Sequence, residues 1–151
     1  MIKYITKPLD QLSDDTIFNK LYYLTNHGAS TMRSLLDHYK VTRTVKNFTV
    51  IIVKQNNRYI GWCLIEKEKT DAFMMFYIKP DKREKGIGRN LINRAKRYVK
   101  NKGVKIIFVA PWNDTSKAFF VSMSFKRYPP LLPAICAYSP AYSSFNWHIN
   151  I

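Results

Sequence analysis

The sequence is poor in acidic residues, and this shortage is its most unusual property. Only 10 of its 151 residues are Asp or Glu, against 25 Lys and Arg, so the formal net charge is +15. A field of this sign attracts polyanions and repels cationic substrates such as polyamines. The basic residues are spread along the chain, which indicates that the charge belongs to the folded surface. An AT-rich genome, which favours Lys codons, would account for part of the excess.

Cysteines and long apolar runs are also scarce. Cys63 and Cys136 have neither the number nor the spacing of a disulfide framework or zinc site, so we expect two reduced core residues. No His, Cys, Asp or Glu group has metal-ligand spacing, and we expect no metal. Apolar runs fall short of the ~18 residues that span a bilayer, and Met1 to Tyr4 lacks a signal-peptide layout. We therefore expect a cytoplasmic protein.

The composition nevertheless supports a hydrophobic core. Hydrophobic residues make up 46% of the chain and aromatic residues 15%, which is more than a disordered chain of high charge would contain. The length is usual for one domain, and no linker, repeat or low-complexity segment divides it. We expect a single domain covering residues 1–151.

Apolar periodicity predicts a mixture of strands and helices. Strands are expected at Ile2–Thr6, Phe48–Lys54, Arg58–Glu66, Ala72–Ile78, Lys105–Ala110, Ile135–Tyr138 and Phe145–Ile151. Turns are expected at residues 55–57 and 67–70. Helices are expected from Ser13, from Ser30, from Gly88 to the stop at Gly103, and in a short segment from Asn113 through Met123. The helix from Gly88 should point its basic residues mostly outward, Lys96 among them.

The most informative stretch lies between the strand ending at Ile78 and the helix from Gly88. It reads Ile78-x-Pro80-x-x-Arg83-x-x-Gly86-x-Gly88. Backbone amides at a turn that enters a helix point at an anion, and glycines let that anion approach closely. The pattern therefore predicts a pyrophosphate site. A Rossmann turn fits less well because it needs a third glycine and a later acidic residue.

This stretch resembles, position for position, the coenzyme A signature of the GNAT (general N-acetyltransferase) superfamily. A second segment, Asn113-x-x-Ser116-x-x-Phe119-Phe120-x-x-x-Ser124-Phe125, is similar to another part of that family, and the resemblance covers most of residues 1–128. It implies an α/β GNAT fold, with a mixed, mostly antiparallel sheet of six or seven strands and helices on both faces. It also implies acetyl-CoA as cofactor and acetyl transfer to an amine.

The resemblance assigns the cofactor-binding residues. The pantetheine arm would insert between the strand carrying Ile78 and the strand Lys105–Ala110, and Lys82 or Lys117 would reach the 3′-phosphate. The residues it places at the cofactor are Phe76, Ile78, Arg83, Glu84, Lys85, Gly86, Ile87, Gly88, Arg89, Asn113, Ser116 and Lys117.

The catalytic residues stay open, because two family positions differ here. Phe120 stands where many members have a tyrosine that protonates the leaving thiolate. The position of a glutamate base in some members falls at or next to Ala72, and the nearby Asp71 would face the other side of the strand. Replacement candidates are Tyr77, Tyr128 and Tyr138, with Tyr142 and His148 behind them.

Two other functions are compatible with the sequence. A GNAT-fold protein that binds a partner without catalysis would explain Phe120, and a plain nucleic-acid-binding domain would explain the charge alone. For an enzyme, we expect an acceptor on an acidic macromolecule, with nucleic acid ahead of protein. The expected contact surface is the outer face of Arg89 to Lys102 with Lys40, Arg43, Lys46, Lys126 and Arg127, and Trp112, Tyr128, Tyr138 or Tyr142 would stack on bases.

Overall fold

The computed structural model describes residues 1–9, 48–111, 113–127 and 147–151. Several predictions from the sequence lie outside these ranges. They concern the two helices from Ser13 and Ser30, the strand Ile135–Tyr138, and the side chains of Lys40, Arg43, Lys46, Trp112, Tyr128, Cys136, Tyr138 and Tyr142.

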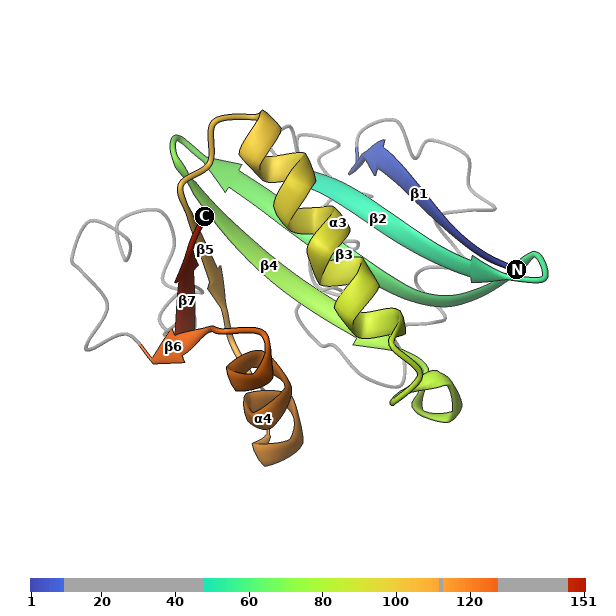
Figure 1. Ribbon diagram of the computed structural model, residues 1–151. Helices are drawn as coiled ribbons and strands as arrows, with labels where there is room; N and C mark the ends of the chain where they lie inside the picture. Colours follow the sequence, from blue (N-terminus) through green and yellow to red (C-terminus); the bar gives the residue numbers. More distant parts are fainter. Residues whose placement is uncertain (10–47, 112, 128–146) are drawn as a thin grey trace, which may run out of the picture. The chain divides into compact units, whose positions relative to one another are not determined.

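The described residues form one mixed sheet with two α-helices (Figure 1). The strands are β1 (Ile2–Pro8), β2 (Phe48–Gln55), β3 (Arg58–Glu68), β4 (Asp71–Ile78), β5 (Ile106–Val109), β6 (Lys126–Arg127) and β7 (Trp147–Asn150). The helices are α3 (Ile87–Asn101) and α4 (Asp114–Ser122), with a 3-10 turn, η2, at Pro80–Lys82. The strand order is β1-β2-β3-β4-β5-β7-β6. The predicted α/β class and the mixed sheet of six or seven strands are confirmed.

Two turns join β2, β3 and β4, and the sequence located the first better than the second. Asn56 and Asn57 both have positive φ, 51° and 64°, as a two-residue hairpin turn requires. The predicted turn at residues 67–70 was too long, because β3 continues through Glu68. Lys69, with φ 54°, then begins a short connection to β4.

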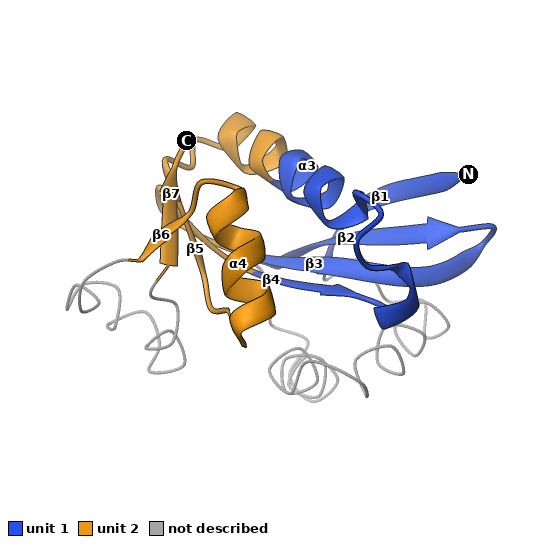
Figure 2. Cartoon of the chain, turned by 60° about the horizontal axis from the view of Figure 1, so that its bottom comes forward, with its two compact units in different colours: residues 1–65, 75–95 blue, residues 66–74, 96–151 orange. Residues whose placement is uncertain are grey.

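Compact unit 1 comprises Met1–Ile65 and Met75–Ala95, and its described part contains the β1–β2 pair and the first half of α3 (Figure 2). β1 pairs antiparallel with β2 from Ile2 opposite Gln55 to Pro8 opposite Thr49. Val50 to Val53 are buried on both faces of the sheet, and α3 buries Leu91, Ile92 and Ala95. Cys63 is a buried free thiol in β3, as predicted.

Compact unit 2 comprises Glu66–Met74 and Lys96–Ile151 (Figure 2). The first residues of β4 pair in parallel with β5, from Asp71 opposite Ile106 to Met74 opposite Val109. β7 pairs antiparallel with β5 and with the two-residue strand β6, which the sequence did not predict because two residues carry no periodicity. Lys96 lies half-buried over the Phe125 ring, 5.8 Å from its centroid, although the helical pattern predicted it to point outward.

β3, β4 and α3 each contribute residues to both units. The single domain of residues 1–151 therefore stays a prediction.

Candidate functional site

The chain reverses tightly where β4 ends, within unit 1. The Lys79 amide donates to the Ile60 carbonyl of β3 at 2.8 Å, which holds the end of β4 against its neighbour. The amides of Lys82 and Arg83 then donate to the carbonyls of Lys79 and Pro80, at 2.8 and 3.3 Å. These bonds define a fixed turn between β4 and α3.

The start of α3 presents unused backbone donors. The first helical bond joins the Asn90 amide to the Gly86 carbonyl at 3.1 Å, so the amides of Ile87, Gly88 and Arg89 precede the hydrogen-bonded ladder. Within the described ranges these three amides have no backbone acceptor. Such amides carry the partial positive charge of a helix N-terminus and bind anions.

Two left-handed residues shape the turn in front of these donors. Glu84 has φ 62° and Gly86 has φ 78°. A Cβ built on Gly86 would meet no atom within 4 Å, so the space over the turn is open. Lys82, Arg83, Lys85 and Arg89 supply positive charge there, opposed by Asp81 and Glu84. An open, amide-rich and cationic turn of this kind is typical of anion-binding sites.

Arg83 is held by its own strand. Its Nε donates to the Ile78 carbonyl at 2.8 Å, and its guanidinium lies 5.8 Å from the centroid of the Tyr77 ring. The Tyr77 ring in turn stacks on Trp62 of β3, with centroids 5.9 Å apart and planes at 21°. These contacts, here called the Trp62–Tyr77–Arg83 column, hold the Arg83 guanidinium beside the turn.

Tyr77, a candidate proton donor, is buried, with 5% of its surface exposed. Burial raises the pKa of its phenol, while the nearby Arg83 charge opposes the rise. The phenol therefore stays protonated at neutral pH.

Sequence reasoning missed the importance of Gly61. A Cβ at this β3 residue would lie 2.5 Å from the Tyr77 carbonyl oxygen and 2.6 Å from the Ile78 Cδ1. Only a glycine lets β3 approach the end of β4 this closely. A glycine inside a predicted strand is the signal that could have identified the contact.

The second predicted segment forms the start of α4, within unit 2. Asn113 is the N-cap, and its Oδ1 accepts from the Ser116 amide at 2.9 Å. The Asn113 amide donates to the Ser116 hydroxyl at 3.1 Å, which completes a capping box. Lys117 lies 4.0 Å from Asp114 in an exposed ion pair. The side chain of Asn113, which the resemblance places at the cofactor, thus caps the start of α4.

Phe120 is part of the aromatic core of unit 2. It is 6% exposed and contacts Phe125 edge-on, with centroids 5.2 Å apart. Phe119 lies on its other side at 5.6 Å. Phe120 thus packs as a core ring and has no proton to transfer.

The predicted acid–base candidates on other strands lie in different surroundings. Asp71 begins β4, seven residues before Ile78, or about 23 Å along an extended strand. Burial raises its carboxyl pKa. His148 lies on β7, opposite Phe108, with ring centroids 6.3 Å apart. Tyr128, Tyr138 and Tyr142 lie outside the described residues.

A titrating pair that sequence reasoning also missed lies at the end of β3. Glu66 and Glu68 are two residues apart on one face of the strand and share a side-chain hydrogen bond. Burial and the Glu68 charge raise the Glu66 pKa from 4.5 to about 7.

The described residues thus combine a mixed sheet with an open turn between the central strand β4 and the helix α3. The sequence profile described as acetyltransferase (GNAT) family matches residues 17–125. The chain therefore belongs to the GNAT acetyltransferase family, as its coenzyme A signature predicted.

Solved structures share this fold at low sequence identity. Tetrahymena GCN5 superposes with a TM-score of 0.77 at 13% identity, over 99% of this chain and 96% of that one. A GNAT-family acetyltransferase from Staphylococcus aureus gives 0.73 at 12% identity, over 99% of each chain. The PaiA N-acetyltransferase of Thermoplasma acidophilum, solved with coenzyme A, gives 0.63 at 14% identity, over 99% of each chain.

No curated protein sequence matches the chain. Among the described residues, no helix is both long and apolar enough to cross a membrane.

Proposed function

We propose that the protein is an acyl-CoA-dependent N-acetyltransferase that transfers an acetyl group from acetyl-CoA to an amine. The observation that carries this proposal is the turn after β4. There the amides of Ile87, Gly88 and Arg89 have no backbone acceptor within the described ranges, and the space at the Cβ position of Gly86 is open. Family membership supports the same reaction class.

Each part of the turn has a proposed task. The amides from Glu84 to Arg89 bind the pyrophosphate, Arg83 and Lys85 balance its charge, and Lys82 or Lys117 contacts the 3′-phosphate. The backbone of Phe76 and Ile78 pairs with the pantetheine arm, and the Asn113–Ser116 cap fixes the start of α4. When bound, acetyl-CoA supplies an acyl thioester that an amine can attack.

Several groups are candidates for the proton donor to the leaving thiol. Tyr77 keeps its phenolic proton at neutral pH, as an ordinary tyrosine does, and burial raises its pKa further. Its place in the Trp62–Tyr77–Arg83 column favours a positioning role, with solvent as an alternative proton source. Tyr128 and Tyr138 stay candidates from the sequence.

We propose that the amine belongs to an acidic macromolecule in the cytoplasm. The net charge of +15 supports this class of acceptor, because it far exceeds the roughly four negative charges of coenzyme A itself. A cationic acceptor would be repelled, and the chain has only 10 carboxylates with which to bind one.

Calorimetry with acetyl-CoA, followed by mass spectrometry of acetyl transfer to a panel of amines, tests the proposal. Micromolar-range binding together with turnover is expected. Phe120 favours a second candidate, a non-catalytic member that binds coenzyme A or a partner. Binding of acetyl-CoA without turnover of any amine would support that candidate, and absence of binding would refute the cofactor site.

A further inference from the structure

The exposed face of α3 has an unusual composition. Its exposed residues form a continuous arc of the helix, opposite the arc that buries Leu91, Ala95 and Val99. The exposed residues on this arc, here called the α3 ridge, are Arg89, Asn90, Asn93, Arg94, Arg97, Lys100 and Asn101. The ridge thus offers four cations and three amides and no carboxylate.

The ridge charges are not neutralised inside the helix. The α3 sequence, IGRNLINRAKRYVKN, contains no acidic residue, so i,i+4 ion pairs cannot form within it. Across the described ranges, the ion pair observed between side chains joins Lys117 to Asp114 of α4. Within the described residues, therefore, no carboxylate pairs with the ridge cations.

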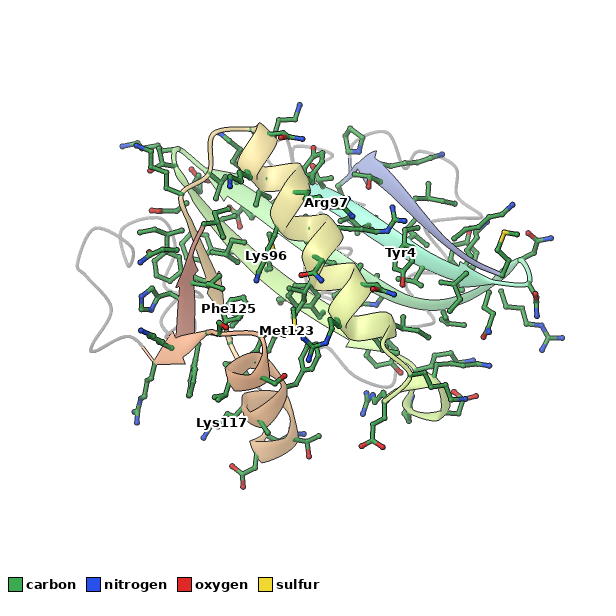
Figure 3. All side chains as sticks on the ribbon, viewed as in Figure 1. Tyr4, Lys96, Arg97, Lys117, Met123 and Phe125 are labelled. Atoms are coloured by element: carbon green, nitrogen blue, oxygen red, sulfur yellow. The ribbon has the colours of Figure 1, made fainter. Side chains whose placement is uncertain are left out.

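Part of the ridge is held in place by β1. The Arg94 guanidinium lies over the Tyr4 ring, 4.4 Å from its centroid, in a cation–π contact within unit 1. Figure 3 labels Tyr4 of β1 and Arg97, which follows Arg94 by three residues on α3. The contact keeps one guanidinium fixed on the surface before any partner binds, which lowers the entropy lost on binding.

Arginine dominates the ridge although lysine dominates the chain. The 25 basic residues are 17 Lys and 8 Arg, whereas the ridge cations are three Arg and one Lys. A bias toward Lys codons would give the opposite ratio. Arginine is the residue whose planar fork matches a phosphate with two hydrogen bonds.

The ridge lacks the apolar side chains that are typical of surfaces that bind anionic membranes or acidic proteins. A helix that lies on an anionic membrane carries large apolar side chains beside its cations, and a protein interface usually has buried aromatic or aliphatic anchors. In the described part of the chain, the exposed large hydrophobic side chains are Met1 and Val121, and neither belongs to α3. A purely polar, arginine-rich surface is typical of nucleic-acid contacts.

We propose that the α3 ridge binds the phosphodiester backbone of a nucleic acid. Arg94, Arg97 and Lys100 contact phosphates, and the asparagines between them bond to sugar or phosphate oxygens. The proposal deepens the proposed function by naming the acidic partner, and only its catalytic consequence rests on that function. Binding itself is measurable without acetyl-CoA.

Fluorescence anisotropy with a labelled RNA hairpin and a labelled DNA duplex, titrated at rising salt, tests the ridge. The variant is Arg97→Gln/Lys100→Gln, which leaves the cofactor turn and the Arg94–Tyr4 contact intact. Its matched control is Lys3→Gln/Arg58→Gln, which removes one exposed Lys and one exposed Arg outside α3. The ridge variant should bind at least about tenfold more weakly, and its log–log salt slope should fall by about 2. The control should change little.

Three outcomes would overturn the proposal. One is no binding of either nucleic acid at low salt, and another is an equal loss in the ridge and control variants, which would indicate diffuse charge only. The third is equal competition by polyglutamate or by anionic lipid vesicles, which would indicate another class of partner. Calorimetry with acetyl-CoA on the same variants separates the two proposals, because the ridge variant should keep its cofactor affinity.

Discussion

The turn after β4 and the segment that forms α4 both resemble the GNAT family, but they differ in which family features they share. The turn shares a backbone geometry, whereas the α4 segment shares a helix cap and lacks the tyrosine. The turn keeps its backbone geometry, with donors at Ile87 to Arg89 and open space over Gly86. The α4 segment keeps its cap at Asn113 but has a buried phenylalanine, Phe120, at the position of a family proton donor. The backbone geometry proposed to bind the cofactor is therefore present in this chain, whereas the side chain with the proton-donating role implied by the resemblance is not.

Gly86→Asp should have the largest effect on this comparison. It forces a side chain into a left-handed position and places a negative charge beside the pyrophosphate. Like charges in contact cost several kcal/mol, so acetyl-CoA binding should weaken at least about 100-fold in calorimetry.

Gly103→Asp is the matched control for that experiment. Gly103 also has positive φ, 84°, and also has no atom within 4 Å of a built Cβ, but it follows the other end of α3. Its backbone penalty should therefore be similar while cofactor affinity is kept. Equal affinity of Gly86→Asp and wild type would exclude the turn as the binding site.

Arg83→Lys tests whether a side chain also supports the turn. In the wild type, the Arg83 Nε donates to the Ile78 carbonyl while the guanidinium lies over the Tyr77 ring. Lysine keeps the positive charge, but its single ammonium group cannot make both contacts in this way. The loss of this charge-assisted hydrogen bond should weaken acetyl-CoA binding about tenfold. The control is Lys85→Arg, which exchanges the same two residue types in the reverse direction within the same turn and should leave acetyl-CoA affinity unchanged. If Arg83→Lys also bound acetyl-CoA with wild-type affinity, the backbone amides alone would bind the cofactor.

Phe120→Tyr tests the other half of the comparison. Its rate of acetyl transfer should be equal to wild type or higher, and a gain approaching ~100-fold would show that a general acid had been restored. The buried hydroxyl should cost about 1 kcal/mol of stability, measured by urea unfolding. A tenfold slower but normally folded variant would contradict the prediction.

The smallest expected effect is a pH dependence of protein stability. It arises at Glu66 of β3, which lies outside both the turn and α4. The folded protein binds a proton at Glu66 up to pH 7, whereas the unfolded chain releases it near pH 4.5. Stability should therefore fall as pH rises from 4.5 to 7. Because the carboxyl is partly exposed, solvent screening limits the loss to about 1 kcal/mol.

Glu66→Gln imitates the protonated carboxyl and should remove that loss. It should match wild type in urea unfolding at pH 5 and exceed it at pH 8. Glu68→Gln is the companion variant, since it removes the repulsion but keeps the burial. An unchanged pH profile in Glu66→Gln would assign the dependence to other groups.

Much of the fold was predictable because it depends on local patterns. Continuous apolar runs identified β2 and β4, two adjacent asparagines identified the hairpin turn, and the 3.6-residue period identified α3. The anion-binding turn was predictable for the same reason, since glycine spacing and the flanking elements determine it.

The features that the sequence did not predict depend on contacts between distant residues. The Trp62–Tyr77–Arg83 column depends on how β3 faces β4, and a single sequence does not fix that register. The Glu66–Glu68 pair is local to β3, but the burial that raises the Glu66 pKa is not visible in the strand's own sequence. Lys96 was predicted outward from its helical position, yet the Phe125 ring covers it. The catalytic residues stay undetermined because proton transfer depends on side-chain placement that no short motif encodes.

The close approach of β3 to β4 at Gly61 limits which residues can occupy this position. A single methyl group there would collide with the backbone of β4 at Tyr77 and push aside the strand end that leads into the turn. A Cβ at Gly86 in the turn would meet open space, but a side chain at Gly61 has no room to reorient. Any descendant that keeps this strand spacing should therefore keep glycine at the position, and sequencing of active variants from a saturated library would show it as intolerant of change although it lies outside the signature.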